Sequence, residues 1–204
     1  MSLSMFAVFW VVSVLFVITP GADWAYAISA GIRGRRVLPA VAGMLSGHLV
    51  ATLIVAAGIG SVIAGAPGVL TALTVAGAGY LLWLGIGMFR QPPEPIADRI
   101  EDAGSPQKWA LRGFCISGLN PKVFLLFLAL LPQFTDAHAT WPLPLQMTAL
   151  GLLHVVTCGV VYLLVGYGSS TLLRTRTRAA QNISRISGGL MIIIALLLLA
   201  EQFY

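Results

Sequence analysis

Six long apolar stretches constrain this chain more than any other feature of its sequence. A membrane-spanning helix needs about 20 mainly apolar residues, and six segments qualify: about Met5–Ile32, Leu38–Ala64, Val69–Phe89, Gly113–Leu131, Leu145–Ser169 and Ile183–Ala200. Each must be helical, because unpaired backbone groups cost several kcal/mol in lipid. Only 9% of the residues are charged, whereas a soluble domain carries about 25%. We therefore expect an all-α integral membrane protein with six transmembrane helices.

The basic residues divide unequally between the two sides of these spans. Eleven of the 12 lysines and arginines lie after the first, third and fifth spans: Arg33, Arg35, Arg36, Arg90, Arg99, Lys108, Arg112, Arg174, Arg176, Arg178 and Arg185. Because basic loops stay in the cytoplasm, these loops are predicted to be cytoplasmic, with both termini facing outward. Their placement in short loops argues against a nucleic-acid partner despite the net charge of +5.

The two halves of the chain have similar sequence patterns. A proline interrupts the first span at Pro20 and the fourth at Pro121, and a lone histidine stands in the second and fifth spans, at His48 and His154. With three helices in each half, the two copies must cross the membrane in opposite directions. Inverted repeats with broken helices are a recurring plan of secondary transporters, so the sequence predicts two inverted three-helix repeats.

This pattern predicts a single transmembrane domain over residues 1–204. Repeat one covers about 1–90, a polar cytoplasmic linker about 91–112, and repeat two about 113–204. The linker is too small for a catalytic domain, and no Ser/His/Asp set or H-E-x-x-H motif is present, so no enzyme is predicted. Glycine-rich helix faces serve close packing, and they permit a homodimer without requiring one.

Asp23 is an acidic residue within the first apolar stretch, directly after the Pro20-Gly21 break. A charge this deep costs at least about 2.5 to 3.5 kcal/mol on insertion scales. One interpretation is that the first helix ends near Ile18 and Asp23 caps a second, interfacial helix. The other is a carboxylate in a polar cavity, able to carry a proton or to face a substrate amine.

The second break, Asn120-Pro121-Lys122, has similar potential. Proline removes a backbone donor, Asn120 offers both donors and an acceptor, and Lys122 is a lysine inside an apolar stretch. Lys122 either extends towards the cytoplasmic interface or has a functional role. If the repeat holds, Asp23 and Lys122 can pair across its pseudo-two-fold axis.

Both span histidines allow two interpretations. A lone histidine is more often a hydrogen-bonded core residue, but the matched positions of His48 and His154 also suit a proton relay. His154 and Cys158 lie four residues apart on one helix face, which would suit a soft metal. One such pair without further ligands is weak evidence, so neither a metal site nor a cofactor is predicted.

Four motifs resemble those of the LysE/RhtB family of bacterial amino-acid exporters (lysine exporter / homoserine-threonine resistance). They are Thr19-Pro20-Gly21-Ala22-Asp23, Gly79-Tyr80-Leu81-Leu82-Trp83-Leu84-Gly85, Asn120-Pro121-Lys122-Val123-Phe124 and Leu131-Pro132-Gln133-Phe134. The first resembles the family's TPG-x-D signature, although Ala22 stands where a second proline is frequent. The resemblance covers essentially the whole chain. It implies a protein of the bacterial inner membrane that exports amino acids or close derivatives on the proton gradient. The outward-facing termini expected from the basic loops would then be periplasmic.

The leading expectation is therefore a secondary active exporter whose site lies between the two broken helices. Asp23 would bind the cargo amine or carry the coupling proton, and the region from Asn120 to Lys122 would meet the carboxylate, with the opposite assignment also open. A metal-cation exporter would need more intramembrane carboxylates or a His/Cys cluster. A membrane thiol-disulfide electron carrier would need Cys115 and Cys158 to meet.

Overall fold

A computed structural model describes residues 3–32, 36–63, 69–90 and 105–169, together with scattered residues between 182 and 200. Its elements are α1 (Leu3–Val17), α2 (Ala22–Ile32), α3 (Val37–Ile63), α4 (Val69–Arg90), α5 (Pro106–Gly118), α6 (Pro121–Leu130), a 3₁₀ turn η1 (Pro132–Phe134) and α7 (Leu143–Tyr167). The described part of the chain contains helices and turns but no strand. This confirms the predicted all-α class.

Several of these elements are long and apolar enough to cross a bilayer. Among the described residues, Val37–Gly58 of α3 and Leu143–Tyr167 of α7 qualify alone, with mean hydropathies of 1.9 and 2.1. The pairs α1 with α2 and α5 with α6 each qualify when taken as one bent span. The described residues of 182–200 are helical, but much of that segment lies outside the description. The count of six spans and the inverted repeat therefore stay predictions.

The chain bends sharply between α1 and α2. The axes of Leu3–Val17 and Ala22–Gly31 differ by 63°, and Pro20 lies in the connecting turn. The end of a helix leaves carbonyl groups without intrahelical partners. The indole Nε1 of Trp24 donates a 2.8 Å hydrogen bond to one of them, the carbonyl of Val17. This bond holds α2 against the end of α1.

A second bend separates α5 from α6, with 50° between Pro106–Gly118 and Val123–Phe134. Pro121 is the first residue of α6, a position where its fixed φ suits a helix and its missing N–H is not needed. At the end of α5 the amide of Leu119 donates to the carbonyl of Cys115. The helix therefore stops just before Asn120.

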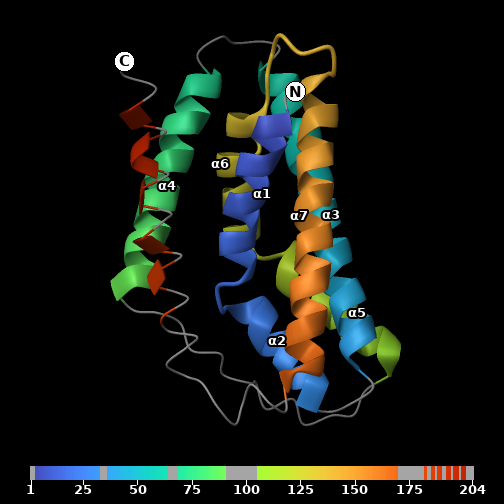
Figure 1. Cartoon of the computed structure of the whole chain (residues 1–204). Coiled ribbons are helices and arrows are strands. Elements are labelled where there is room, and N and C mark those ends of the chain that lie inside the picture. Colours follow the sequence, from blue (N-terminus) through green and yellow to red (C-terminus); the bar gives the residue numbers. More distant parts are fainter. Residues whose placement is uncertain are drawn as a thin grey trace.

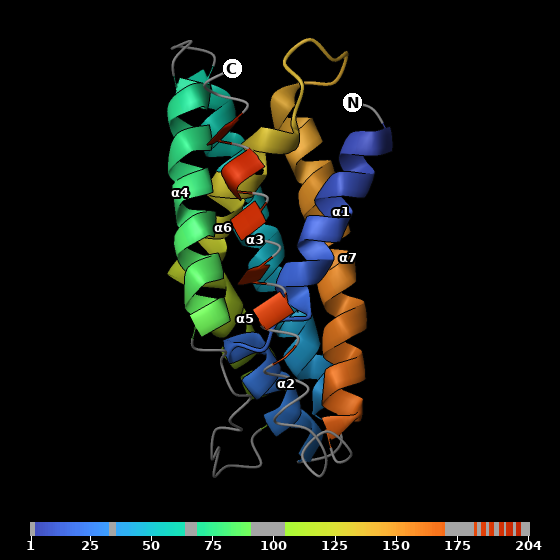
Figure 2. The ribbon, with the colours of Figure 1, turned by 60° about the vertical axis from the view of Figure 1, so that its left-hand side comes forward.

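The helices form an elongated bundle (Figures 1 and 2). α3 and α7 run along most of its length, α1 and α2 follow one another beside α7, and α5 lies against α3. Two glycines of α3 allow this last contact. A Cβ at Gly43 would overlap the carbonyl of Ala110, and one at Gly47 would lie 2.6 Å from the amide nitrogen of Gly118.

Three of the described basic residues lie near one end of the bundle. Arg36 precedes α3, Arg90 ends α4, and Lys108 lies in the first turn of α5, whereas α1 begins at the opposite end (Figure 1). This agrees with the predicted separation of charge. The basic stretches 33–35, 91–104 and 170–181 lie outside the described residues, and the side of the membrane stays a prediction.

The predicted linker, 91–112, ends in a helix, because α5 already begins at Pro106. The side chain of Ser105 accepts a 3.4 Å hydrogen bond from the amide of Lys108, and Pro106 occupies the first turn. A capping serine followed by proline is a strong helix start. The helix before the second break therefore begins earlier than the start near Gly113 that the sequence predicted.

Candidate functional site

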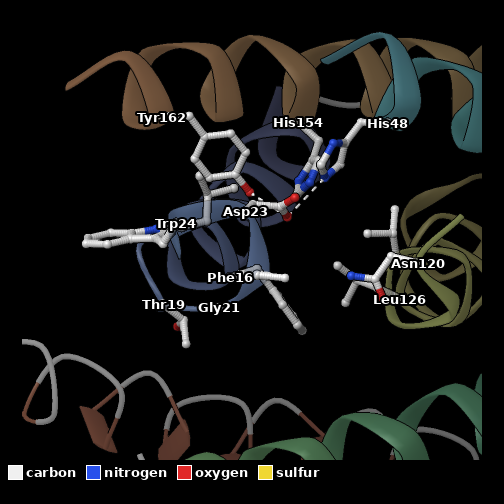
Figure 3. Close-up of a pocket in the computed structure, with 13 residues that line it drawn as sticks. Phe16, Thr19, Gly21, Asp23, Trp24, His48, Asn120, Leu126, His154 and Tyr162 are labelled. Atoms are coloured by element: carbon white, nitrogen blue, oxygen red, sulfur yellow. Dashed lines mark hydrogen bonds and ion pairs between the residues drawn. The ribbon is translucent and has the colours of Figure 1, made fainter. Parts of the chain in front are cut away.

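A pocket lies where the two breaks face α3 and α7 (Figure 3). Its walls combine the turn between α1 and α2, the start of α6, and side chains from the middle of both long helices. The lining residues are Phe16, Val17, Thr19, Gly21, Ala22, Asp23, Trp24, His48, Asn120, Val123, Leu126, His154 and Tyr162. Both proline breaks therefore contribute to one cavity.

Asp23 is the acidic group of this pocket. It lies in the first turn of α2, where the positive end of the helix dipole favours a carboxylate. Ser117 Oγ donates a 2.6 Å hydrogen bond to its Oδ1, and the Tyr162 hydroxyl donates a 3.2 Å bond to its Oδ2. Its side chain remains 15% exposed. The carboxylate is thus held in place by α5 and α7 but still reaches the cavity.

His48 is the nearest basic group to this carboxylate among the described residues. Its Nε2 lies 3.9 Å from Asp23 Oδ2, within ion-pair distance. Its Nδ1 lies 2.9 Å from the carbonyl oxygen of Met44. Because a carbonyl can only accept, Nδ1 carries a hydrogen, which leaves Nε2 as the nitrogen that faces Asp23. A single proton added between Nε2 and the carboxylate would pair the two groups.

His154 lies directly beside His48. The ring centroids are 5.6 Å apart, and the Nδ1 of His154 lies 2.8 Å from Ser13 Oγ on α1. The ring of Phe127 stands edge-on to His154, with a centroid distance of 5.2 Å. Both histidines are buried. The two positions that the repeat pattern matched in the sequence therefore meet in space.

The start of α6 forms the opposite wall. The backbone carbonyl of Asn120 accepts from the amides of Val123 and Phe124, at 3.0 and 3.3 Å, so Asn120 stands at the N-terminal end of this helix. Asn120 and Val123 line the pocket together with Gly21 and Asp23 from the start of α2. Two helix N-termini, each with a positive dipole end, therefore border the same cavity.

The structure brings together five of the eight residues selected from sequence: Gly21, Asp23, His48, Asn120 and His154. Pro20 is buried at the first break but is not a lining residue. Pro121 and Lys122 begin α6, while their side chains lie outside the description. The pairing of Asp23 with Lys122 therefore stays a prediction. A second helix does start after the first break, at Ala22, with Asp23 in its first turn, and this turn borders the pocket. The two interpretations of Asp23, as a helix cap or as a group that serves the cavity, both stay predictions.

Sequence reasoning missed three polar residues that lie within hydrogen-bond distance of Asp23 or His154: Ser13, Ser117 and Tyr162. One signal for Tyr162 was available, because His154, Cys158 and Tyr162 follow each other at four-residue spacing and share one helix face. Ser13 and Ser117 carry no such signal. Each is a small polar residue in an apolar helix, and only tertiary packing brings them to His154 and Asp23.

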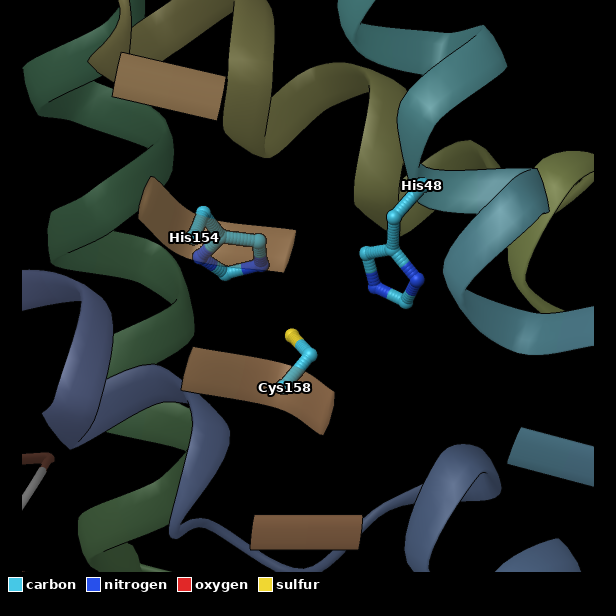
Figure 4. A group of neighbouring side chains, drawn as sticks. All are labelled: His48, His154 and Cys158. Carbon is cyan, nitrogen blue, oxygen red and sulfur yellow. The ribbon is translucent and has the colours of Figure 1, made fainter. Parts of the chain in front are cut away.

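One group of residues has the composition of a metal-binding cluster. The ligand atoms of His48, His154 and Cys158 all lie within 4.8 Å of one another, and all three residues are buried (Figure 4). The fold therefore adds His48 to the pair of ligands that the sequence had suggested. The same region can also bind an ammonium group, through Asp23, or hold a proton between Asp23 and His48.

Comparison with known proteins fits this architecture. The family model of the LysE type translocators matches residues 5–202. An uncharacterized membrane protein of Vibrio cholerae is 30% identical over 152 residues, 73% of each chain. The leucine efflux protein of Klebsiella pneumoniae is 28% identical over 134 residues, 64% of this chain and 63% of that protein. No solved structure matches significantly. The match over nearly the whole chain confirms the motif resemblance, and the protein belongs to the LysE type translocator family.

Proposed function

We propose that the protein is a proton-coupled secondary exporter of amino acids or close derivatives across the bacterial inner membrane, with both termini in the periplasm. The observation that carries this proposal is the position of Asp23. Its carboxylate lies in a pocket between two helix breaks, 3.9 Å from the Nε2 of a buried histidine, His48. The family match and the similarity to a leucine efflux protein support the same function.

The pocket has a suitable partner for each part of a zwitterion. Asp23 can pair with the cargo ammonium group, and the N-terminal end of α6 at Asn120 can receive its carboxylate. Phe16, Val17, Val123 and Leu126 supply apolar walls, which favour an apolar cargo side chain. The reverse arrangement, with the carboxylate at the start of α2, is the alternative within this proposal.

Proton coupling follows from competition at Asp23. A carboxylate that has taken up a proton no longer pairs with an ammonium group, so protonation from the outside would release the cargo there. His48 can share that proton, because its Nε2 faces Oδ2 of Asp23. Return of the proton to the cytoplasm would restore the binding state. Alternating access would then involve movement of the two broken helix pairs around this pocket.

The first test is release of amino acids from bacterial cells loaded with a mixed amino-acid pool. The chain offers a matched control, because Asp23→Asn and Asp136→Asn are the same chemical change. Asp136 lies beyond η1, where its Oδ1 accepts from the amide of His138. We expect the wild type and Asp136→Asn to export specific amino acids, an uncoupler to stop this, and Asp23→Asn at matched expression to be inactive.

The other readings of the sequence predict different outcomes in the same cells. A metal-cation exporter would lower cellular metal content without releasing amino acids. A thiol-disulfide carrier would change the redox state of Cys115 and Cys158, which lie on α5 and α7 as free thiols, one exposed and one buried. Amino-acid release at the level of the vector control would contradict the proposed function.

A further inference from the structure

The group formed by His48, His154 and Cys158 has a ligand set that a proton-handling site does not require. Two imidazole nitrogens and one thiol converge from α3 and α7 (Figure 4). Their ligand atoms lie within 4.8 Å of one another, and the residues are 2%, 3% and 0% exposed. Cys158 is not a lining residue of the pocket, so the transport proposal gives it no role.

The outer contacts of both rings favour metal binding. Nδ1 of His48 is held by the carbonyl of Met44 at 2.9 Å, and Nδ1 of His154 lies 2.8 Å from Ser13 Oγ. Histidine ligands usually have their second nitrogen held in this way, which fixes the orientation of the ring and leaves the other nitrogen for the ion. In both residues Nε2 is the nitrogen left for this purpose.

The distances suit a small tetrahedral ion after a modest adjustment. With bonds of about 2.0 Å to nitrogen and 2.3 Å to sulfur, a tetrahedral ion holds such ligand atoms about 3.3 to 3.6 Å apart. The most widely separated of these atoms, which lie up to 4.8 Å apart, therefore need to approach by up to about 1.5 Å. Imidazole with thiolate selects zinc-class and softer ions over Mg²⁺ or Ca²⁺.

We propose that His48, His154 and Cys158 bind a divalent ion of the zinc class, and that the bound ion inhibits the transporter. On binding, the thiol loses its proton to solvent and coordinates as thiolate. Asp23 lies next to this group, with its Oδ2 3.9 Å from His48 Nε2. The inhibitory part of this proposal rests on the proposed function. A bound ion would occupy both histidines and would attract the carboxylate of Asp23. Export requires that carboxylate to release its proton and its cargo.

Binding can be tested without any transport assay. Purified full-length protein in detergent is titrated with Co²⁺, which gives visible bands in a tetrahedral site and a near-ultraviolet charge-transfer band when a thiolate coordinates. Cys115→Ser is the matched control, because Cys115 is exposed on α5 whereas Cys158 is buried. We expect the thiolate band in the wild type and in Cys115→Ser, its loss in Cys158→Ser, and its displacement by Zn²⁺. Absence of the band from the wild type would overturn the proposal.

His154→Gln provides a second binding test in case Cys158→Ser does not fold. Size-exclusion chromatography identifies which variants are intact, and an intact His154→Gln should bind Co²⁺ at least about 10-fold more weakly, since even changes to outer-shell partners cost about 10- to 100-fold in metal affinity. Unchanged affinity in this variant would contradict the assigned site.

Inhibition is measured in proteoliposomes with the amino acid released in the cellular assay. Zn²⁺ should inhibit the wild type and Cys115→Ser, while Cys158→Ser transports but requires at least about 10-fold more Zn²⁺. Equal inhibition of all three proteins would place the effect elsewhere and refute the proposal. If the wild type exports no amino acid, the proposed function fails, while the Co²⁺ titration still decides whether the ion binds.

Discussion

The hydroxyl of Ser117 donates a 2.6 Å hydrogen bond to Oδ1 of Asp23. Ser117 lies in the last turn of α5 and Asp23 in the first turn of α2, so this bond joins one broken helix pair to the other at their bends. A movement of either pair relative to the other must break this bond or carry the carboxylate with it. Ser117 therefore positions Asp23 rather than contacting solvent, since its side chain is fully buried.

Replacing Ser117 with alanine should impair export without unfolding the protein. Hydrogen bonds to charged groups contribute about 1.5 to 3 kcal/mol, so the loss of this one should lower the export rate by about 10- to 100-fold. Ser46→Ala is the control, because the Ser46 hydroxyl donates within its own helix, to the carbonyl of Gly43. Both variants should retain the thermal stability of the wild type within a few degrees. Equal export by both variants would contradict the positioning role.

His48→Gln should weaken the coupling of export to the pH gradient. In the wild type we expect export to rise as the external pH falls, because protons arriving from outside displace the cargo from Asp23. The groups around this proton are Asp23, His48, His154 and Tyr162. Glutamine cannot take up the proton, so the pH profile should flatten.

The chain contains its own control for this experiment in His138, which is exposed beyond η1. His138→Gln should follow the wild-type pH profile in proteoliposomes with an imposed gradient. A His48→Gln profile that coincides with that of His138→Gln would exclude His48 from the coupling step.

The sequence predicted the helical class and several of the residues that line the pocket, but not the contacts between them. Asp23, His48 and His154 could be found because charged or titratable residues are costly in an apolar helix and therefore conspicuous. Their proximity could only be suggested, through the similar positions of the two histidines. The hydrogen bonds of Ser117 and Tyr162 to Asp23 span 94 and 139 residues of sequence, and no local pattern encodes such pairings. The early start of α5 was missed because its first turns include the polar residues Gln107, Lys108 and Arg112, which interrupt the apolar pattern.

Loss of the side-chain amide should affect the stability of the protein differently at two glutamines near η1. Gln146 is fully buried. Its Oε1 accepts from the amide of Asp136 at 2.9 Å, and its Nε2 donates to the carbonyls of Asp136 and Trp141. It therefore holds the loop between η1 and α7. The side-chain amide atoms of Gln133 are also buried but have no hydrogen-bond partner among the described residues.

Gln146→Met should destabilise the protein by about 1 to 3 kcal/mol, because it removes three hydrogen bonds to part-buried backbone groups. Gln133→Met removes polar atoms that have no such bonds, and it should be neutral or stabilising. Thermal unfolding of the purified variants in one detergent compares the two directly. A larger loss of stability for Gln133→Met than for Gln146→Met would contradict the hydrogen bonding described here.

Two glycines serve different purposes: Gly43 allows two helices to pack closely, and Gly21 borders the pocket. A Cβ at Gly43 would overlap the carbonyl of Ala110, and since a backbone group cannot rotate away, Gly43→Ala should cost about 1 to 3 kcal/mol of stability. A Cβ at Gly21 would meet nothing within 4 Å, so Gly21→Ala should leave thermal stability unchanged. Because Gly21 lines the pocket, the added methyl group takes up space there. Gly21→Ala should therefore reduce export of amino acids with large side chains more than export of small ones, and an equal effect on both would show that cargo does not pass this position.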